Sequence, residues 1–135
     1  MVDLGCGEGR ILLEAVDSFG IAGGTGVEWD EAILNQAREA CGDHPELTWE
    51  QADLMDGTWT PREDATVLTA YLTAHVLASV AFGDLVRTWL DGCQGRRLVT
   101  LMYAMPAKGW TPTRVATLGS GGGSIQSYRY DSPAK

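Results

Sequence analysis

Three glycines near the start of the chain have the spacing of a ligand-binding turn. The first ten residues are "MVDLGCGEGR", in which Gly5, Gly7 and Gly9 directly follow the apolar run 2–4. Glycine has no Cβ, so these residues let the backbone turn tightly and approach a ligand closely. A helical pattern begins at Arg10, and the free N–H groups at the start of a helix favour an anionic group. The pattern therefore predicts a nucleotide-type binding turn.

Three acidic residues lie near the ends of three successive predicted strands and have the chemistry to bind one nucleoside. Asp3 stands just before the turn, where a carboxylate can meet an ammonium group. Glu28 follows Gly9 by roughly 20 residues, the spacing at which an acid accepts hydrogen bonds from ribose hydroxyls. Asp53, in "QADL", can accept from an adenine amino group, and Trp29 can lie against an adenine face. Because parallel strands end at one edge of a sheet, we expect these residues to share a crevice.

Each of these residues also has a simpler interpretation. Glu28 could be a solvated strand end, Asp53 a loop or capping residue, and Cys6 a reactive thiol at a helix start. Dinucleotide enzymes that transfer hydride use a similar glycine triplet. Their fingerprint, however, places its third glycine where Arg10 stands and has no use for an acid at Asp3. The order and spacing of the whole set favour a nucleoside ligand other than NAD.

Strands and helices are predicted to alternate around these residues. Apolar runs predict strands at 2–4, 25–29, 47–51, 65–72 and 98–103, and helical spacing predicts helices at 10–19, 30–41 and 76–90. Asp30 is expected to cap the second helix, and Gly20 and Gly42 to end the first two helices. Gly83 and Asp84 could split the third. Such alternation predicts parallel strands joined by right-handed helical crossovers.

The C-terminal part of the chain has a different pattern. Two short strand-like runs, 115–118 and 125–130, flank the loop "GSGGGS" and predict an antiparallel hairpin. The alternative is that this loop is a flexible linker. The fold class expected for residues 1–135 is thus α/β, a single domain with a Rossmann-like, mostly parallel sheet and a C-terminal antiparallel hairpin.

Composition and charge exclude several classes of function. The chain has 135 residues, 44% of them hydrophobic, and a net charge of -8. An acidic surface repels phosphate backbones, so we expect a protein or small-molecule partner and no nucleic acid. No apolar run approaches the roughly 20 residues that span a bilayer. The cysteines, at 6, 41 and 93, form neither a disulfide framework nor a metal-ligand pattern with the two histidines, which favours a cytoplasmic protein.

Several motifs resemble those of a known family. "VDLGCGEGR", "GVEWD" and "QADL" are similar to the first three motifs of class I S-adenosylmethionine-dependent methyltransferases. "ATVLTAYL", "MPAKGWTPTRV" and "IQSYRYD" resemble the small branch related to the lysine methyltransferases of mitochondrial carriers and the ATP synthase c subunit. Members of that branch carry a helical segment before the first strand. The resemblance therefore implies that this chain is N-terminally truncated.

The resemblance also implies a cofactor and the residues that bind it. The cofactor is S-adenosyl-L-methionine. Its methionine end is expected at Asp3, Gly5, Cys6, Gly7 and Gly9, its ribose at Glu28, and its adenine at Trp29, Asp53 and Leu54.

The chemistry expected is methyl transfer to a protein lysine or another small nucleophile. Such transfer is an in-line displacement in which the enzyme mainly supplies proximity and orientation. An amine acceptor must also lose a proton. Tyr71, at the end of the fourth predicted strand, is the best-placed polar group to hydrogen-bond an amine, although it could instead be a packed aromatic residue. The alternative function is an inactive cofactor-binding remnant, or a fragment completed by another chain.

Overall fold

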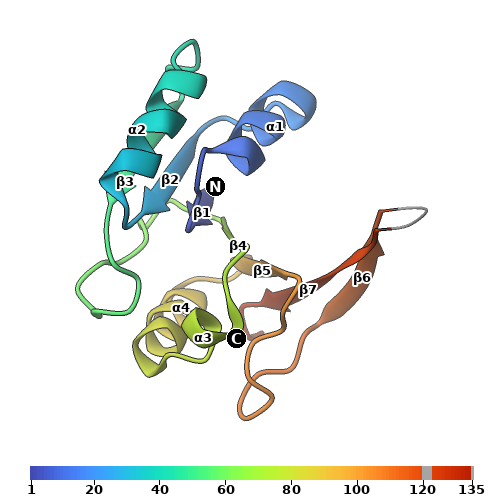
Figure 1. Cartoon of the computed structure of the whole chain (residues 1–135). Coiled ribbons are helices and arrows are strands. Elements are labelled where there is room, and N and C mark those ends of the chain that lie inside the picture. Colours follow the sequence, from blue (N-terminus) through green and yellow to red (C-terminus); the bar gives the residue numbers. More distant parts are fainter. Residues whose placement is uncertain (120–122, 135) are drawn as a thin grey trace.

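The structure, a computed structural model, describes residues 1–119 and 123–134 and has a seven-stranded sheet at its centre (Figure 1). Its strands are β1 (Val2–Leu4), β2 (Gly24–Glu28), β3 (Leu47–Gln51), β4 (Val67–Ala70), β5 (Arg97–Leu101), β6 (Arg114–Leu118) and β7 (Ile125–Asp131). Its helices are α1 (Arg10–Phe19), α2 (Glu31–Ala40), α3 (Ala74–Leu77) and α4 (Val80–Gly92). The predicted alternation of strands and helices is confirmed.

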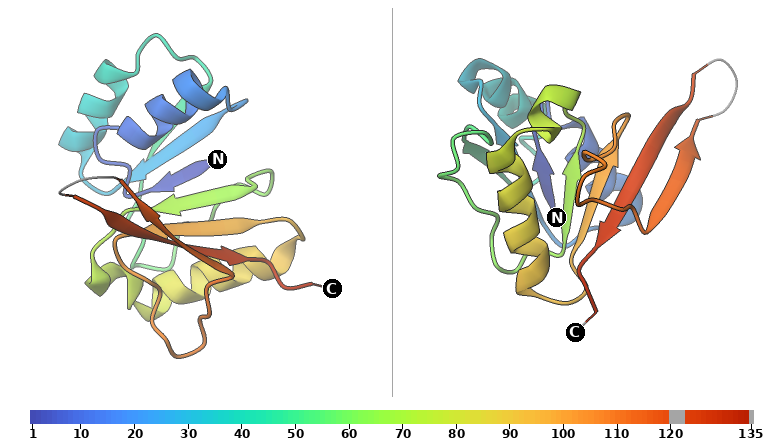
Figure 2. Two further views of the ribbon diagram at one scale, coloured as in Figure 1. Left: turned by 90° about the vertical axis from the view of Figure 1, so that its right-hand side faces the viewer. Right: turned by 90° about the horizontal axis from the view of Figure 1, so that it is seen from below.

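The short strand β1 lies in the middle of the sheet. The strand order is β3-β2-β1-β4-β5-β7-β6, and β7 runs antiparallel to both of its neighbours. Leu4 of β1 pairs with Val27 of β2 on one side and with Ala70 of β4 on the other. The parallel strands point the same way, so their carboxyl ends meet at one edge (Figure 2). The glycine turn follows β1 at that edge.

Helices cover both faces of the sheet and bury two apolar layers (Figure 1). On one face, Phe82 and Val86 of α4 are fully buried in a cluster that includes Leu68 of β4. On the other face, Leu12 of α1 is buried together with Leu47 of β3. These two layers hold the central strands, and with them the carboxyl edge, in a fixed arrangement.

The predicted cap of α2 and the predicted end of α1 are confirmed, whereas α2 ends at Ala40 with Cys41 as its C-cap, before the expected Gly42. The carboxylate of Asp30 accepts hydrogen bonds from the N–H groups of Ala32 and Ile33 at 2.9 and 3.3 Å, which caps α2. Gly20 ends α1 in a left-handed conformation with φ of 59°. In the described part of the chain, no helix is both long and apolar enough to cross a membrane.

The third predicted helix is divided at a different place from the one expected. The break between α3 and α4 falls at 78–79, whereas Gly83 and Asp84 lie inside α4. A glycine inside a helix costs about 1 kcal/mol relative to alanine. Burial of Phe82 and Val86 on the neighbouring positions offsets that cost, since each such side chain contributes roughly 1.5–3 kcal/mol. Tertiary packing therefore overrides the local preference of the glycine.

The predicted C-terminal hairpin is confirmed, since β6 and β7 pair antiparallel. Its second strand, β7, inserts beside β5, where Leu98 pairs with Tyr130. Residues 120–122 of the "GSGGGS" loop lie outside the described residues. The alternative that this loop is a linker concerns those residues and stays untested. Two predicted strands were too long: β4 covers only Val67–Ala70 of the predicted 65–72, and β5 ends at Leu101, directly before the backbone turn at Met102.

Candidate active site

Backbone hydrogen bonds tie the glycine turn to the neighbouring strand. The Gly5 N–H donates to the Val27 carbonyl at 2.8 Å. Gly5, Gly7 and Gly9 have φ values of 71°, 54° and 81°, which glycine adopts without the strain of other residues. A Cβ at Gly9 would lie 2.6 Å from the Trp49 ring, whereas one at Gly7 would meet open space. Gly9 therefore allows close packing beneath the turn, and Gly7 leaves its outer side open to a ligand.

Asp3 is buried with one carboxylate oxygen unused. Only 1% of the residue is exposed, and its Oδ1 accepts a hydrogen bond from the Thr69 hydroxyl at 2.7 Å. Its Oδ2 is buried and has no hydrogen-bond partner among the described residues. Burial raises the pKa of Asp3 to about 7, and the nearby Glu28 carboxylate adds to the rise while the Thr69 hydrogen bond opposes it. Buried polar atoms are normally paired, so this oxygen fits a ligand that donates a hydrogen bond.

Glu28 lies at the end of β2 with its carboxylate held by the backbone. Its Oε2 accepts from the Gly7 N–H at 3.1 Å, and its Oε1 accepts from the N–H groups of Trp29 and Asp30 at 3.0 and 3.3 Å. Only 8% of the residue is exposed, so it is not the solvated strand end of the simpler interpretation. A carboxylate has about four acceptor positions, and three are used here. The free position is on Oε2, beside the turn.

Two hollows at the carboxyl edge contain nearly all the predicted site residues. One, of about 470 Å³, is lined by Asp3, Gly5, Cys6, Gly7 and Tyr71 among others. The other, of about 460 Å³, is lined by residues that include Gly5, Glu28, Trp29, Asp53, Leu54 and Tyr71. Gly5 and Tyr71 belong to both, so the hollows meet there. Gly9 lines neither hollow, because it is buried against Trp49.

The second hollow has an apolar floor and a partly polar rim. Leu54 is buried, whereas Trp29 is 70% exposed and Tyr71 is 48% exposed. The carboxylate of Asp53 accepts from the Met55 N–H at 2.8 Å through Oδ1. Its other oxygen is not used by that bond. A flat, partly polar ring such as a purine matches this combination of an exposed indole, a buried leucine and a carboxylate.

The Cys6 thiol does not have the properties of a reactive group. Cys6 is buried, and burial raises the pKa of the thiol to about 12, with the carboxylates of Asp3 and Glu28 adding to the rise. The thiol therefore stays protonated at neutral pH, and the alternative that it is a nucleophile is wrong.

Sequence reasoning missed two residues that shape the site. Thr69 of β4 holds the Asp3 carboxylate, and Leu72 occupies the space that a side chain at Gly5 would need. Neither has a sequence signal of its own, because Thr69 acts through the register of β1 against β4 and Leu72 acts from the segment that follows β4. In that register Asp3 lies opposite Thr69.

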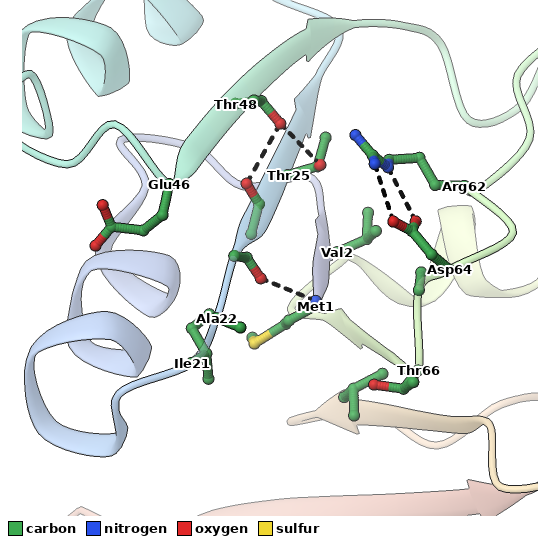
Figure 3. A pocket seen from close by; sticks show the side chains of 14 residues that line it. Met1, Val2, Ile21, Ala22, Thr25, Glu46, Thr48, Arg62, Asp64 and Thr66 are labelled. Carbon is green, nitrogen blue, oxygen red and sulfur yellow. Dashed lines mark hydrogen bonds and ion pairs between the residues drawn. The ribbon is translucent and has the colours of Figure 1, made fainter.

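A further hollow, of about 580 Å³, lies at the opposite edge of the sheet (Figure 3). It surrounds the amino end of β1, and its polar groups largely bind one another. Arg62 pairs with Asp64 at 2.9 Å, and the hydroxyls of Thr25 and Thr48 are 2.9 Å apart. It contains none of the predicted site residues, so the candidate site is the pair of hollows at the carboxyl edge.

Comparisons with known proteins identify the family. Residues 1–91 match the family described as "Methyltransferase domain". An RNA methyltransferase from Salinibacter ruber, solved with S-adenosyl-L-homocysteine, is 28% identical with a TM-score of 0.78, over 99% of this chain and 80% of that chain. TrmN from Thermus thermophilus is 19% identical with a TM-score of 0.74, over 98% of this chain and 43% of that chain. No curated protein matches this chain in sequence.

The chain belongs to the methyltransferase domain family, since the match spans more than half of it. Its fold is that of the class I S-adenosylmethionine-dependent methyltransferases, as predicted. The family match and the S-adenosyl-L-homocysteine held by the similar structure from Salinibacter ruber agree with S-adenosylmethionine, the cofactor that the resemblance implies. The buried, unpaired oxygen of Asp3 and the open side of Gly7 are features of this chain that fit such a ligand.

Proposed function

We propose that this chain transfers a methyl group from S-adenosylmethionine to an amine held beside Tyr71, on a protein lysine or another small nucleophile. The observation that carries the proposal is the meeting of the two hollows at Gly5 and Tyr71. If the methionine part is held in one hollow and the nucleoside in the other, the sulfur that joins them would lie at this junction. Tyr71 then stands beside the reacting centre.

The proposed cofactor contacts follow from the polar atoms that are left unused. Asp3 Oδ2 accepts a hydrogen bond from the cofactor's ammonium group. Glu28 Oε2 accepts from a ribose hydroxyl, and Asp53 accepts from the adenine amino group, with Trp29 and Leu54 against the ring. Gly5, Cys6 and Gly7 line the methionine part.

The chain's contribution to the chemistry is mainly orientation. When bound, S-adenosylmethionine supplies an electrophilic methyl group on a positively charged sulfur. A cationic acceptor would first lose a proton to water; the neutral amine nitrogen would then form a bond to that carbon as the sulfur–carbon bond breaks, which would leave S-adenosylhomocysteine and a methylated ammonium. The Tyr71 hydroxyl accepts a hydrogen bond from the amine N–H and aims the lone pair. Tyr71 is half-exposed, so an acceptor can reach it.

The charges around the two hollows support an amine acceptor. Acidic side chains among the lining residues are Asp3, Glu8, Glu28 and Asp53. Among the described residues, Arg10 is the one basic residue of either lining, and its guanidinium pairs with Glu8 at 2.7 Å. An acidic site attracts a cationic amine and repels phosphate. This charge balance supports the relation to the lysine methyltransferase branch, which stays a prediction.

RNA is a second candidate acceptor. The observation that favours it is the 28% identical relative from Salinibacter ruber, which is an RNA methyltransferase. The absence of a nucleic-acid partner, expected from the net charge, therefore stays a prediction.

Methylation assays with labelled S-adenosylmethionine test the proposed function. Lysine-containing peptides are expected to be labelled in preference to RNA. Tyr71→Phe is expected to lower turnover about tenfold, the effect of losing one hydrogen bond to the amine, without weakening cofactor binding. Tyr128→Phe is the matched control, because Tyr128 lines neither hollow. Labelling of RNA alone would contradict the lysine assignment, and cofactor binding without labelling of either class would support the inactive remnant.

A further inference from the structure

The backbone makes an unusual turn directly after β5. Met102 has φ of 70° and is the single non-glycine residue with positive φ in 1–119 and 123–134. The Tyr103 N–H donates to the Leu101 carbonyl at 2.9 Å, which closes a three-residue turn around Met102. A residue with a Cβ adopts this conformation only at a cost in free energy, and glycine or asparagine is usual there. The turn is therefore a site of stored strain.

Hydrogen bonds on both sides hold the strained turn in place. The Met102 N–H donates to the Gln126 carbonyl of β7 at 2.8 Å. The hydroxyl of Thr100 donates to the Tyr103 carbonyl at 2.7 Å. Backbone strain that surrounding contacts maintain in this way is concentrated at functional sites in proteins.

The strained turn lies at the same edge as the candidate active site. In the register of the sheet, Leu4 pairs with Ala70, and Ala70 pairs with Thr100. The glycine turn, Tyr71 and the Met102 turn therefore follow three neighbouring strands. Large exposed side chains follow two of these strands: Tyr71, 48% exposed, comes directly after β4, and Met102 and Tyr103, 44% and 43% exposed, come directly after β5.

We infer that Met102 and Tyr103, together with Tyr71, form the surface that receives the methyl acceptor, and that this acceptor is an amine on an alkyl chain. This inference rests on the proposed function. A thioether and aromatic rings pack against an alkyl stem, and the faces of tyrosine rings attract an ammonium group. The acidic lining of the neighbouring hollows favours the same cationic group over phosphate. Because residue 102 is a methionine in spite of the strain, the turn presents a side chain that a glycine would lack.

Two substitutions at one position separate this role from a structural one. Met102→Gly removes the strain and the side chain together. Its melting temperature is expected to rise by about 2–4 °C, while turnover with lysine-containing peptides falls about tenfold. Met102→Leu keeps both the bulk and the strain, so it is expected to retain more turnover than Met102→Gly and to show no rise in melting temperature. Phe19→Ala is the control, since Phe19 is 78% exposed at the far end of α1.

Methyl NMR of methionine-labelled protein provides a readout independent of turnover. The protein is saturated with S-adenosylhomocysteine and titrated with Nα-acetyl-lysine amide or, separately, with a short single-stranded RNA. The Met102 methyl resonance is expected to shift saturably with the lysine probe, whereas that of Met105, which is 3% exposed, stays unchanged. A shift with RNA alone would overturn the amine assignment. If the Met102 methyl resonance does not shift with either probe, or if Met102→Gly keeps full turnover, the assignment of Met102 to the acceptor surface is wrong.

The same experiment separates this inference from the proposed function. Binding of S-adenosylhomocysteine to the unchanged protein and to Met102→Gly is measured first by calorimetry, and equal affinity is expected because Met102 lines neither hollow. If the unchanged protein fails to bind it, the proposed function is refuted and the inference with it. If binding is normal and Met102 does not respond, only the inference is refuted.

Discussion

Binding of S-adenosylhomocysteine is expected to tighten as the pH rises through 7, with release of a proton from Asp3. In the free protein, burial raises the pKa of Asp3 to about 7, so the carboxyl is largely protonated in mildly acidic solution. An ammonium group beside the unpaired Oδ2 stabilises the carboxylate and lowers that pKa. Below pH 7 the ligand must therefore displace the proton, and affinity is expected to rise by up to about tenfold per pH unit.

Calorimetry in two buffers of different ionisation enthalpy measures both the affinity and the proton count, from about pH 5.5 to about pH 8. Asp3→Asn is expected to bind weakly at every pH and to release no proton. The matched ligand is 5′-methylthioadenosine, which keeps the nucleoside and lacks the amino-acid part, so its affinity is expected to be independent of pH. Affinity for S-adenosylhomocysteine that does not change with pH would show that its ammonium group lies elsewhere.

The same carboxyl is expected to make the ligand-free protein less stable as the pH rises from about 4 to about 7. In this window the folded state keeps a proton on Asp3 that the unfolded state, with its ordinary pKa of 3.8, has released. The folded state thus binds more protons, so the free energy of unfolding falls, by at most ~4 kcal/mol over the window. Asp3→Asn is expected to remove this part of the slope in urea unfolding, because an amide does not titrate.

Glu28→Ala is expected to weaken cofactor binding by about 2–4 kcal/mol, roughly 30- to 1000-fold, and to destabilise the free protein as well. The cofactor effect follows from loss of a charged acceptor for the ribose, partly replaced by water. The stability effect follows from three N–H groups, of Gly7, Trp29 and Asp30, that lose their acceptor. Binding and unfolding are measured on the same samples by calorimetry and urea titration.

Two further variants separate the ribose contact from the support of the turn. Glu28→Gln keeps one acceptor oxygen and introduces a donor, so both effects are expected to be smaller than with alanine. Glu46→Gln is the matched control, since Glu46 lines the hollow at the opposite edge of the sheet (Figure 3). Loss of stability with unchanged affinity in Glu28→Ala would assign Glu28 to the turn alone.

The parts of the fold that follow from local sequence were predictable. Asp30 begins α2 through hydrogen bonds to N–H groups two and three residues away, and Gly20 ends α1 through its own backbone angles. The glycine turn likewise depends on three residues spaced two apart. Local rules were also enough to place Glu28 at the end of one strand and Asp53 just after the next, and therefore both at the carboxyl edge.

The contacts that determine the chemistry of the site depend on register, which local patterns do not specify. Asp3 meets Thr69, a residue on the neighbouring strand β4, only because the two lie opposite each other. The hydrogen bond from the Gly7 N–H to the Glu28 carboxylate joins the glycine turn after β1 to the end of β2. The strained turn at Met102 contains no glycine that would predict it from the sequence. It is held by a hydrogen bond from the Met102 N–H to the Gln126 carbonyl of β7.

A crystal structure of this chain with S-adenosylhomocysteine is the most direct test of the central claim, that the two hollows at the carboxyl edge form one cofactor site. The amino group is expected within hydrogen-bonding distance of Asp3 Oδ2, a ribose hydroxyl at Glu28 Oε2, and the sulfur beside Gly5 and Tyr71. S-adenosylhomocysteine bound in the hollow around Met1 and Arg62, or ribose hydroxyls away from Glu28, would contradict it.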